Sequence, residues 1–303
     1  MKRNLILLTA VAATLAFASC SKSESTTPAG DNPDPSGRVA VQFTGATLDV
    51  EPAPAATRAE SQWTQKGTIG IYALGEETTD IVDGYANVGY TFNGSQSAFF
   101  PDAETIYFPV DGSKRRFAAY FPYEELEGTT YEVDLSEQPT LNDQTAFELL
   151  WTVTGAYDKT QPNVALKFDH QYAKVSIKVQ NGTGIEKDDL GQMTVAMTDM
   201  YLTGEFDVVT GTMTPTGDAD ALTFWRNGDG SGQYALVMPT QARDGRTVNF
   251  TLGSDTFRWA IGEKKFEAGK TYDYTVKVSR TPLGFTATVT DWEEGESGSG
   301  DAE

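Results

Sequence analysis

Cysteine and histidine are nearly absent from this chain, which has one of each in 303 residues. A single cysteine excludes an internal disulfide and any zinc or iron–sulfur site built from several cysteines. A single histidine removes most histidine-based catalysis and metal binding. Basic residues are also scarce, because 23 Lys and Arg stand against 43 Asp and Glu, for a formal charge of −20. A nucleic-acid-binding protein needs a basic surface, so this balance argues strongly against that class.

What the chain does contain favours a β-rich globular protein. Apolar residues make up 39% and charged residues 22%, which is enough apolar surface for a core and argues against global disorder. The length corresponds to about two domains at roughly 100–200 residues each. There are 29 Gly and 13 Tyr, with Thr and Val throughout. This composition favours strands and turns over helices.

The first 20 residues have the pattern of a bacterial export signal. Lys2 and Arg3 precede an apolar run over 5–17, which is shorter than the roughly 20 residues of a membrane-spanning helix. Small residues then precede Cys20, as in a lipobox. We therefore predict a lipoprotein signal peptide over 1–19 and a lipid anchor on Cys20. The alternative is an ordinary signal peptide that leaves Cys20 as a free thiol.

Both ends of the expected mature chain lack the residues needed for a core. Residues 20–37 contain no aromatic or large aliphatic side chain, and we predict a flexible tether there. Residues 293–303 are acidic and rich in Gly and Ser, and we predict a disordered tail.

Apolar and polar residues alternate along much of the remaining chain, as in strands with one buried face. The clearest cases are residues 173–180, 271–278 and 284–290. Further strands are predicted at 39–44, 67–74, 104–110, 115–121, 147–154, 193–198, 233–238 and 247–252, whereas 141–148 and 185–192 could hold a helical turn. Clusters of Gly, Pro, Asn and Asp separate these segments. The pattern predicts an all-β chain.

This many short strands predicts two tandem antiparallel β-sandwich domains. Residues 155–162 form a Gly- and Pro-containing stretch between two predicted strands. We place the boundary there, with an N-terminal β-sandwich domain over 38–157 and a C-terminal β-sandwich domain over 158–292, each of ordinary domain size.

The residues that might carry chemistry have structural explanations. His170 has no second ligand of its type, so a hydrogen-bonding role is expected for it. The segment Asn227–Gly232 resembles the start of a calcium loop, but Met238 occupies the twelfth position, where a bidentate Glu is required. Carboxylate pairs such as Glu124 and Glu125 could suggest glycosidase chemistry, but sequence neighbours on a strand face opposite ways, and in so acidic a chain we expect solvated surface residues. We predict no catalytic residue, no metal ligand, no cofactor and no enzymatic activity.

The five tryptophans suggest one alternative function. We expect Trp63 and Trp151 to lie in the core, as large aromatic residues of sandwiches usually do. Trp225 precedes an exposed Gly-rich turn, which leaves room for a sugar-stacking surface. The alternative is therefore a monomeric cell-surface lipoprotein that binds glycans. A secreted hydrolase is disfavoured, because no nucleophile and base converge.

A series of motifs in a fixed order then identifies a family resemblance. The lipobox and tether are followed by nine motifs. In chain order they are Val39-Ala-Val-Gln-Phe-Thr44, Ala56-Thr-Arg-Ala59, Trp63-Thr-Gln-Lys-Gly-Thr-Ile-Gly-Ile-Tyr72, Ile106-Tyr-Phe-Pro109, Phe117-Ala-Ala-Tyr-Phe-Pro-Tyr123, Leu166-Lys-Phe-Asp-His-Gln-Tyr-Ala-Lys-Val-Ser-Ile-Lys-Val179, Tyr234-Ala-Leu-Val-Met-Pro239, Phe266-Glu-Ala-Gly-Lys-Thr-Tyr-Asp-Tyr274 and Val289-Thr-Asp-Trp-Glu-Glu-Gly295. Each motif alone is weak, but their order over residues 39–295 resembles the fimbrillins, the lipoprotein subunits of type V pili, and their Mfa-like relatives.

The resemblance implies transthyretin-like sandwich domains and a structural subunit or adhesin at the surface of the outer membrane. It also implies assembly with other pilin subunits, as a homo- or hetero-polymer, and contacts with host or bacterial surface glycans or proteins. A protease would cut between Arg58 and Ala59, the first strand would leave, and the C-terminal strand of another subunit would replace it. The alternating residues Leu283, Phe285, Ala287 and Val289 would form this donor strand, unless residues 283–290 complete their own domain.

Overall fold

The structure is a computed structural model that describes residues 37–48, 60–62, 67–138, 148–239, 244–280 and 298–302. Within these ranges nearly all regular structure is β, with a single short 3-10 helix, η1 (Lys187–Gln192). The all-β class is therefore confirmed, and η1 falls in the segment 185–192 where a helical turn was expected. No helix in these ranges is long and apolar enough to cross a membrane.

The N-terminal sheet closes on itself. Its strands are β2 (Gln42–Leu48), β3 (Glu60–Gln62), β4 (Thr68–Leu74), β5 (Val88–Asn93), β6 (Ala98–Pro101), β8 (Arg116–Phe121), β10 (Leu150–Val153) and β11 (Asn163–His170). They are ordered β11-β10-β8-β4-β5-β6-β2-β3, and β2 pairs with β11 as well. Because β11 is bonded to both β10 and β2, the strand β2 completes a ring. Apolar side chains such as Phe43, Phe117 and Phe168 fill this ring.

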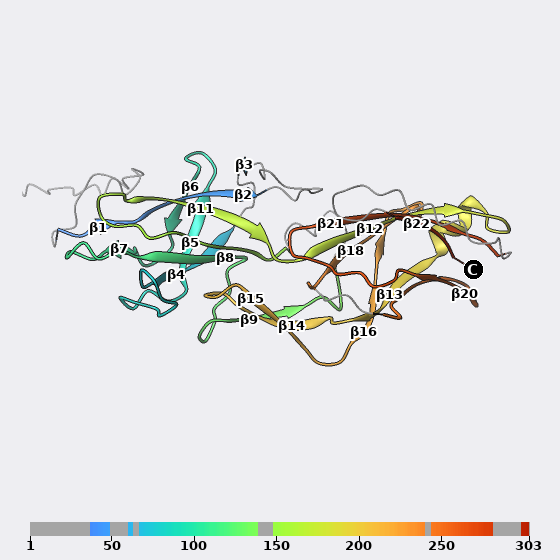
Figure 1. Ribbon diagram of the computed structural model, residues 1–303. Coiled ribbons are helices and arrows are strands. Elements are labelled where there is room, and N and C mark those ends of the chain that lie inside the picture. The colour runs from blue at the N-terminus through green and yellow to red at the C-terminus, as the bar shows by residue number, and fades with distance from the viewer. Residues whose placement is uncertain are drawn as a thin grey trace, which may run out of the picture.

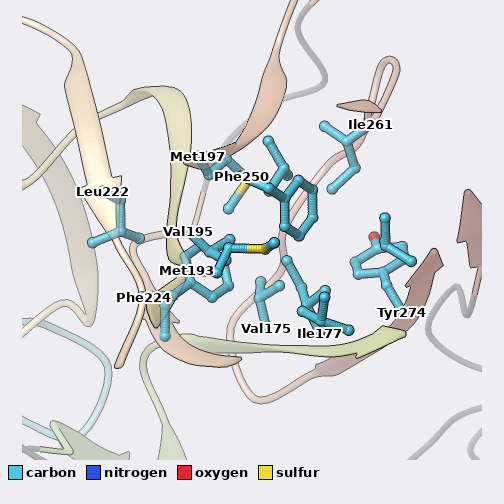
Figure 2. Packing of buried hydrophobic residues seen from close by; sticks show 14 of the residues in the cluster. Val175, Ile177, Met193, Val195, Met197, Leu222, Phe224, Phe250, Ile261 and Tyr274 are labelled. Carbon is cyan, nitrogen blue, oxygen red and sulfur yellow. The ribbon is translucent and has the colours of Figure 1, made fainter. Parts of the chain in front are cut away.

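The C-terminal half is built from two sheets. The first has the order β17-β18-β12-β21-β22, with bounds Trp225–Arg226, Gly232–Val237, Ala173–Asn181, Thr271–Val278 and Gly298–Ala302. The second has the order β16-β13-β19-β20, with bounds Asp220–Thr223, Thr194–Met200, Thr247–Leu252 and Asp255–Ala260. Val175 and Ile177 of the first sheet point into the same core as Val195 and Phe250 of the second (Figure 2). The predicted alternation over 173–180 is confirmed, since every second side chain of β12 from Ala173 to Val179 is buried.

A third, small sheet joins the two halves. It has the order β15-β14-β9, with bounds Thr212–Thr216, Thr203–Asp207 and Thr130–Asp134. Strand β9 comes from the first half of the chain and pairs with β14 from the second. Beside it, Tyr72 and Tyr120 share a buried cluster with Phe206 and Met238. The two halves are therefore connected by packing as well as by the chain.

The two large cores meet at a different point from the boundary predicted after residue 157. Strand β11 pairs with β2 and β10, and its buried residues Val164, Leu166 and Phe168 belong to the N-terminal core. The C-terminal core begins at Ala173. The stretch 155–162 is thus a turn within the N-terminal half, because the strand that follows it pairs with β2.

The end of the chain also departs from expectation. Residues 298–302, which lie in the segment 293–303 expected to be disordered, form β22 and pair in parallel with β21. Backbone groups at a sheet edge can bond to any segment with free N–H and C=O groups, so this pairing needs no apolar side chains.

Seen as a whole, the two halves lie end to end (Figure 1). The short strands β1 (Val39–Ala40) and β7 (Tyr107–Phe108) pair with each other at one end of the molecule. Strands β20 and β22 lie at the other end (Figure 1).

Candidate functional site

The strand that closes the N-terminal sheet, β2, is bonded along both edges. It runs parallel to β11, from Gln42 opposite Asn163 to Thr47 opposite Phe168. Along its other edge it pairs with β6 and then with β3, both antiparallel. A strand near the start of the chain is thus held between strands that follow it in sequence.

Phe43 anchors β2 in the core. Its side chain is 1% exposed, and its ring makes edge-to-face contacts with Tyr90 and Phe117, each with centroids 5.1 Å apart. Burial raises the pKa of Tyr90, whose hydroxyl accepts a hydrogen bond from the backbone N–H of Ile106 at 2.8 Å. Val41, two residues before Phe43, is also buried. Burying a side chain such as that of Phe43 stabilises the fold by about 1.5–3 kcal/mol.

The next inward position of β2 accepts only a very small residue. A Cβ on Gly45 would lie 2.3 Å from Cε2 of Phe99. The Phe99 ring is itself held by neighbours, with its centroid 5.2 Å from that of Phe92 and 6.4 Å from that of Phe168. The strand therefore fills three successive sites, one apolar, one aromatic and one lacking a side chain. We call the sites of Val41, Phe43 and Gly45 the β2 groove.

The start of β2 is fixed by backbone hydrogen bonds. The N–H of Val41 donates to the carbonyl of Ile106 at 2.9 Å, and the N–H of Gln42 donates to that of Pro162 at 2.8 Å. Just before β1, the Arg38 guanidinium lies 4.1 Å from the centre of the Tyr107 ring. Beyond β2, the chain reaches β4 only through residues 49–67, which include β3.

The residues predicted for processing, lipidation and donation lie outside the described residues. They are Cys20, Arg58, Ala59, Leu283, Phe285, Ala287 and Val289. The predicted first strand 39–44 lies within the described residues, where it forms β1 and the first part of β2. Alternation pointed to this strand, but the glycine site at residue 45 carries no signal in the sequence, because it depends on the tertiary position of Phe99.

The chain's one histidine contacts a carboxylate. His170 Nδ1 lies 2.9 Å from Oε2 of Glu148, at the end of β11, and both side chains are largely buried. Across the ranges that the structure describes, no group of three or more His, Cys, Asp or Glu gathers as metal ligands. This contact agrees with a structural role for His170.

The Gly-rich segment 227–232 is a turn closed by its own hydrogen bonds. Asn227 Oδ1 accepts a hydrogen bond from the N–H of Gly232 at 3.0 Å. Asp229 Oδ1 accepts hydrogen bonds from the N–H and hydroxyl of Ser231, which lower the pKa of the Asp229 carboxyl. The side-chain oxygens Asn227 Oδ1 and Asp229 Oδ1 therefore accept hydrogen bonds from within the turn, in agreement with a Gly-rich turn.

Three tryptophans have described surroundings, and they lie in three separate places. Trp151 packs against the cluster between the halves and donates its Nε1–H to the carbonyl of Val208 at 2.7 Å. Trp259 packs against the C-terminal core. Trp225 is half-buried, with its ring 5.8 Å from that of Tyr234. These three residues do not form a shared platform for a sugar.

Comparison with known proteins places this fold in a family. The model of the fimbrillin-like family matches residues 57–292. A candidate fimbrium subunit of Bacteroides uniformis, Fim1C, is 33% identical over 315 residues, which cover 96% of each chain.

Solved structures give the same result. A candidate cell adhesion protein of Bacteroides uniformis is 30% identical, with a TM-score of 0.65 over 82% of this chain and 94% of that one. A candidate cell adhesion protein of Bacteroides ovatus shares the fold, with 18% identity and a TM-score of 0.60 over 79% of this chain and 92% of that one. The family match spans most of the sequence, and this chain belongs to the fimbrillin-like family.

Proposed function

We propose that this protein is a lipid-anchored structural subunit or adhesin of a type V pilus at the surface of the outer membrane. Its relatives are described as fimbrial and cell adhesion proteins, which supports a fimbrial role without enzymatic activity. Cys20 would carry the lipid. Cleavage between Arg58 and Ala59 would separate β1 and β2 from the rest of the chain.

The observation that carries this proposal is the position of β2. It is buried in a closed sheet, yet only residues 49–67 connect it covalently to β4 and the strands beyond. Once that connection is cut, only non-covalent contacts retain the strand. Its departure would open the β2 groove and leave the facing edges of β11 and β6 without a partner.

An open groove of this kind favours the arrival of another strand. Unpaired backbone groups and exposed apolar sites both invite β-augmentation, in which main-chain hydrogen bonds provide strength and alternate side chains provide specificity. The segment Leu283–Val289 of a second subunit has the required alternation. Such an exchange would link subunits into a fibre.

The test compares two arginines that flank β2. Arg58→Ala should prevent the release of β1 and β2, and surface preparations should lose the ladder of multimers that resist SDS. Arg38→Ala is the matched control, because cleavage after Arg38 would leave β2 attached, and its ladder should persist. Fibres built from the Arg58→Ala protein with residues 20–58 still attached would overturn the mechanism. A stable monomer that binds polysaccharide would favour the glycan-binding alternative.

A further inference from the structure

The direction of the β2 groove is fixed by β11. The two strands run parallel, so the Val41 site lies beside the start of β11 and the Gly45 site lies further along it. Strand β11 begins directly after the turn 155–162. Val110 lies near this turn, because its carbonyl accepts a hydrogen bond from Lys159. We call residues 108–115 and 155–163 the N-terminal pole. Strand β2 thus begins at the N-terminal pole and runs toward the C-terminal half (Figure 1), and the β2 groove has the same direction.

Strand β21, the last described strand before the donor segment, ends at the opposite end of the molecule. Strand β12 runs on from the junction with β11, and β21 lies parallel to it, from Thr271 opposite Lys174 to Val278 opposite Asn181. The N–H of Arg280 then donates to the carbonyl of Thr183 at 2.9 Å. We call residues 182–191 and 278–280 the C-terminal pole. Position 283 is only three residues beyond Arg280, a reach of at most about 11 Å.

The residues of the donor segment match the groove in one direction. The groove requires an apolar, an aromatic and a very small residue, in that order from the N-terminal pole. Leu283, Phe285 and Ala287 provide these three in the same order. If the donor strand ran the opposite way with Phe285 still in the Phe43 site, Leu283 would occupy the Gly45 site. A Cβ alone at that site would lie 2.3 Å from Phe99. Ala287 adds a single methyl there, the smallest side chain after glycine, and the Phe99 ring must shift to admit it.

Chain length determines which surfaces would meet. In the forward direction, Leu283 takes the Val41 site, at the N-terminal pole of the acceptor. Because residue 283 lies within about 11 Å of Arg280, the C-terminal pole of the donor would then lie beside that pole.

From these observations we propose that donor residues 283–287 enter the β2 groove of a second copy in the direction of β2. Leu283, Phe285 and Ala287 take the sites of Val41, Phe43 and Gly45. The C-terminal pole of the donor then meets the N-terminal pole of the acceptor. This inference rests on the proposed strand exchange, and it adds the register, the polarity and the contacting surfaces. Val110 is 59% exposed at the N-terminal pole. Its apolar side chain is therefore available for the contact between the two poles.

Cysteine pairs placed on outward-facing residues distinguish the two directions. In the forward register Thr288 takes the place of Ala46, which lies opposite Lys167. In the reverse register Thr286 takes the place of Gln42, which lies opposite Asn163. Neighbouring strands bring such Cα atoms within the 4.4–6.8 Å that a disulfide spans. Fibres are prepared from full chains with Lys167→Cys and Thr288→Cys, and from the matched control with Asn163→Cys and Thr286→Cys, then oxidised.

We expect covalent multimers from the first pair only, with the linked peptides identified by mass spectrometry. Fibres that link only through the control pair, or through neither, would overturn the register while leaving strand exchange intact. Absence of SDS-resistant multimers from the unaltered protein would instead remove the proposed function itself.

Size variants give a second test that needs no cysteine. In the forward register, Ala287→Leu should abolish multimers because it meets Phe99, whereas Leu283→Ala should only weaken them. In the reverse register, Ala287 occupies the roomier Val41 site, so Ala287→Leu should be tolerated, and Leu283→Ala should strengthen the multimers because it relieves the clash with Phe99. That result would overturn the proposal.

Discussion

Trp151 lies directly over Gly211, so closely that a Cβ on the glycine would be 2.5 Å from Cη2 of the indole. Trp151 belongs to β10 of the N-terminal sheet, and Gly211 turns the chain between β14 and β15 with φ +71°. The indole N–H also donates to Val208 in the same segment. One aromatic side chain from the first half is therefore fitted against a glycine turn of the second.

Replacing this glycine should loosen the junction between the halves. Gly211→Ala combines an unfavourable positive φ with displacement of Trp151, and we expect a loss of about 2–4 kcal/mol in the free energy of unfolding. Gly253→Ala is the control, because Gly253 has φ +60° but nothing within 4 Å of its Cβ position. That variant should lose only about 1 kcal/mol. Urea unfolding measures both, and equal losses would show that the indole contact contributes nothing.

The fold class and many strands could be predicted from the sequence because alternation is a local property. Strand β12 illustrates this, since Val175 and Ile177 face the core as their spacing indicates. The domain boundary could not be placed in the same way. The assignment of β11 to the first half depends on its pairing with β2, more than 100 residues earlier in the chain. A local pattern does not reveal which distant strand will be the partner.

Phe43 should contribute far more to stability than its exposed neighbour on the same strand. Phe43→Ala removes a ring packed on Tyr90 and Phe117, and truncations of this type cost about 3–5 kcal/mol. Thr44→Ala changes an exposed side chain of β2 and should change stability by less than about 1 kcal/mol. Urea unfolding compares the two variants, and limited proteolysis should show earlier loss of β2 in Phe43→Ala. Equal stability of the two would mean that Phe43 does not anchor the strand.

The C-terminal half should lose part of its stability in acid through Glu267. Hydrogen bonds from Lys265 and Lys270 lower the pKa of this carboxyl from 4.5 to about 2. A depressed folded-state pKa adds stability above the unfolded value, and this contribution disappears as the pH falls from about 4.5 toward 2. The effect is partly screened because the side chain is about one-third exposed. Thermal unfolding from pH 6 to pH 3 should therefore show a smaller decrease for Glu267→Gln than for the unaltered protein. Parallel curves would contradict this role.

Only part of the candidate site could be predicted from the sequence. Alternation indicated a strand at 39–44, and the resemblance indicated that it leaves. The tight fit between Gly45 and Phe99 carries no sequence signal, because glycine also occurs in most turns of this chain. The same limit applies to β22, whose Gly-Ser-Gly-Asp-Ala sequence has low strand propensity, so that only backbone pairing with β21 explains it.

Cys20 should determine where the protein is found. If this residue carries the lipid, Cys20→Ala should leave an unprocessed or soluble protein, because acyl chains provide the membrane affinity. Cys20→Ser is a useful companion, since it keeps the size of the side chain while removing the thiol. Membrane fractionation and metabolic acyl labelling measure the outcome. Normal fractionation and labelling of both variants would rule out lipidation at this position.

Charges on the inward face of the donor segment should stop polymerisation without unfolding the subunit. Phe285→Asp with Val289→Asp removes two apolar contacts worth about 1.5–3 kcal/mol each and places carboxylates in an apolar groove. Thr286→Asp with Thr288→Asp adds the same charge to the outward face, where water solvates it, and should still form multimers. SDS-resistant ladders report assembly, and circular dichroism reports folding of the monomer. A first variant that still polymerises would exclude these residues as donors, whereas one that unfolds would show that 283–290 completes its own domain.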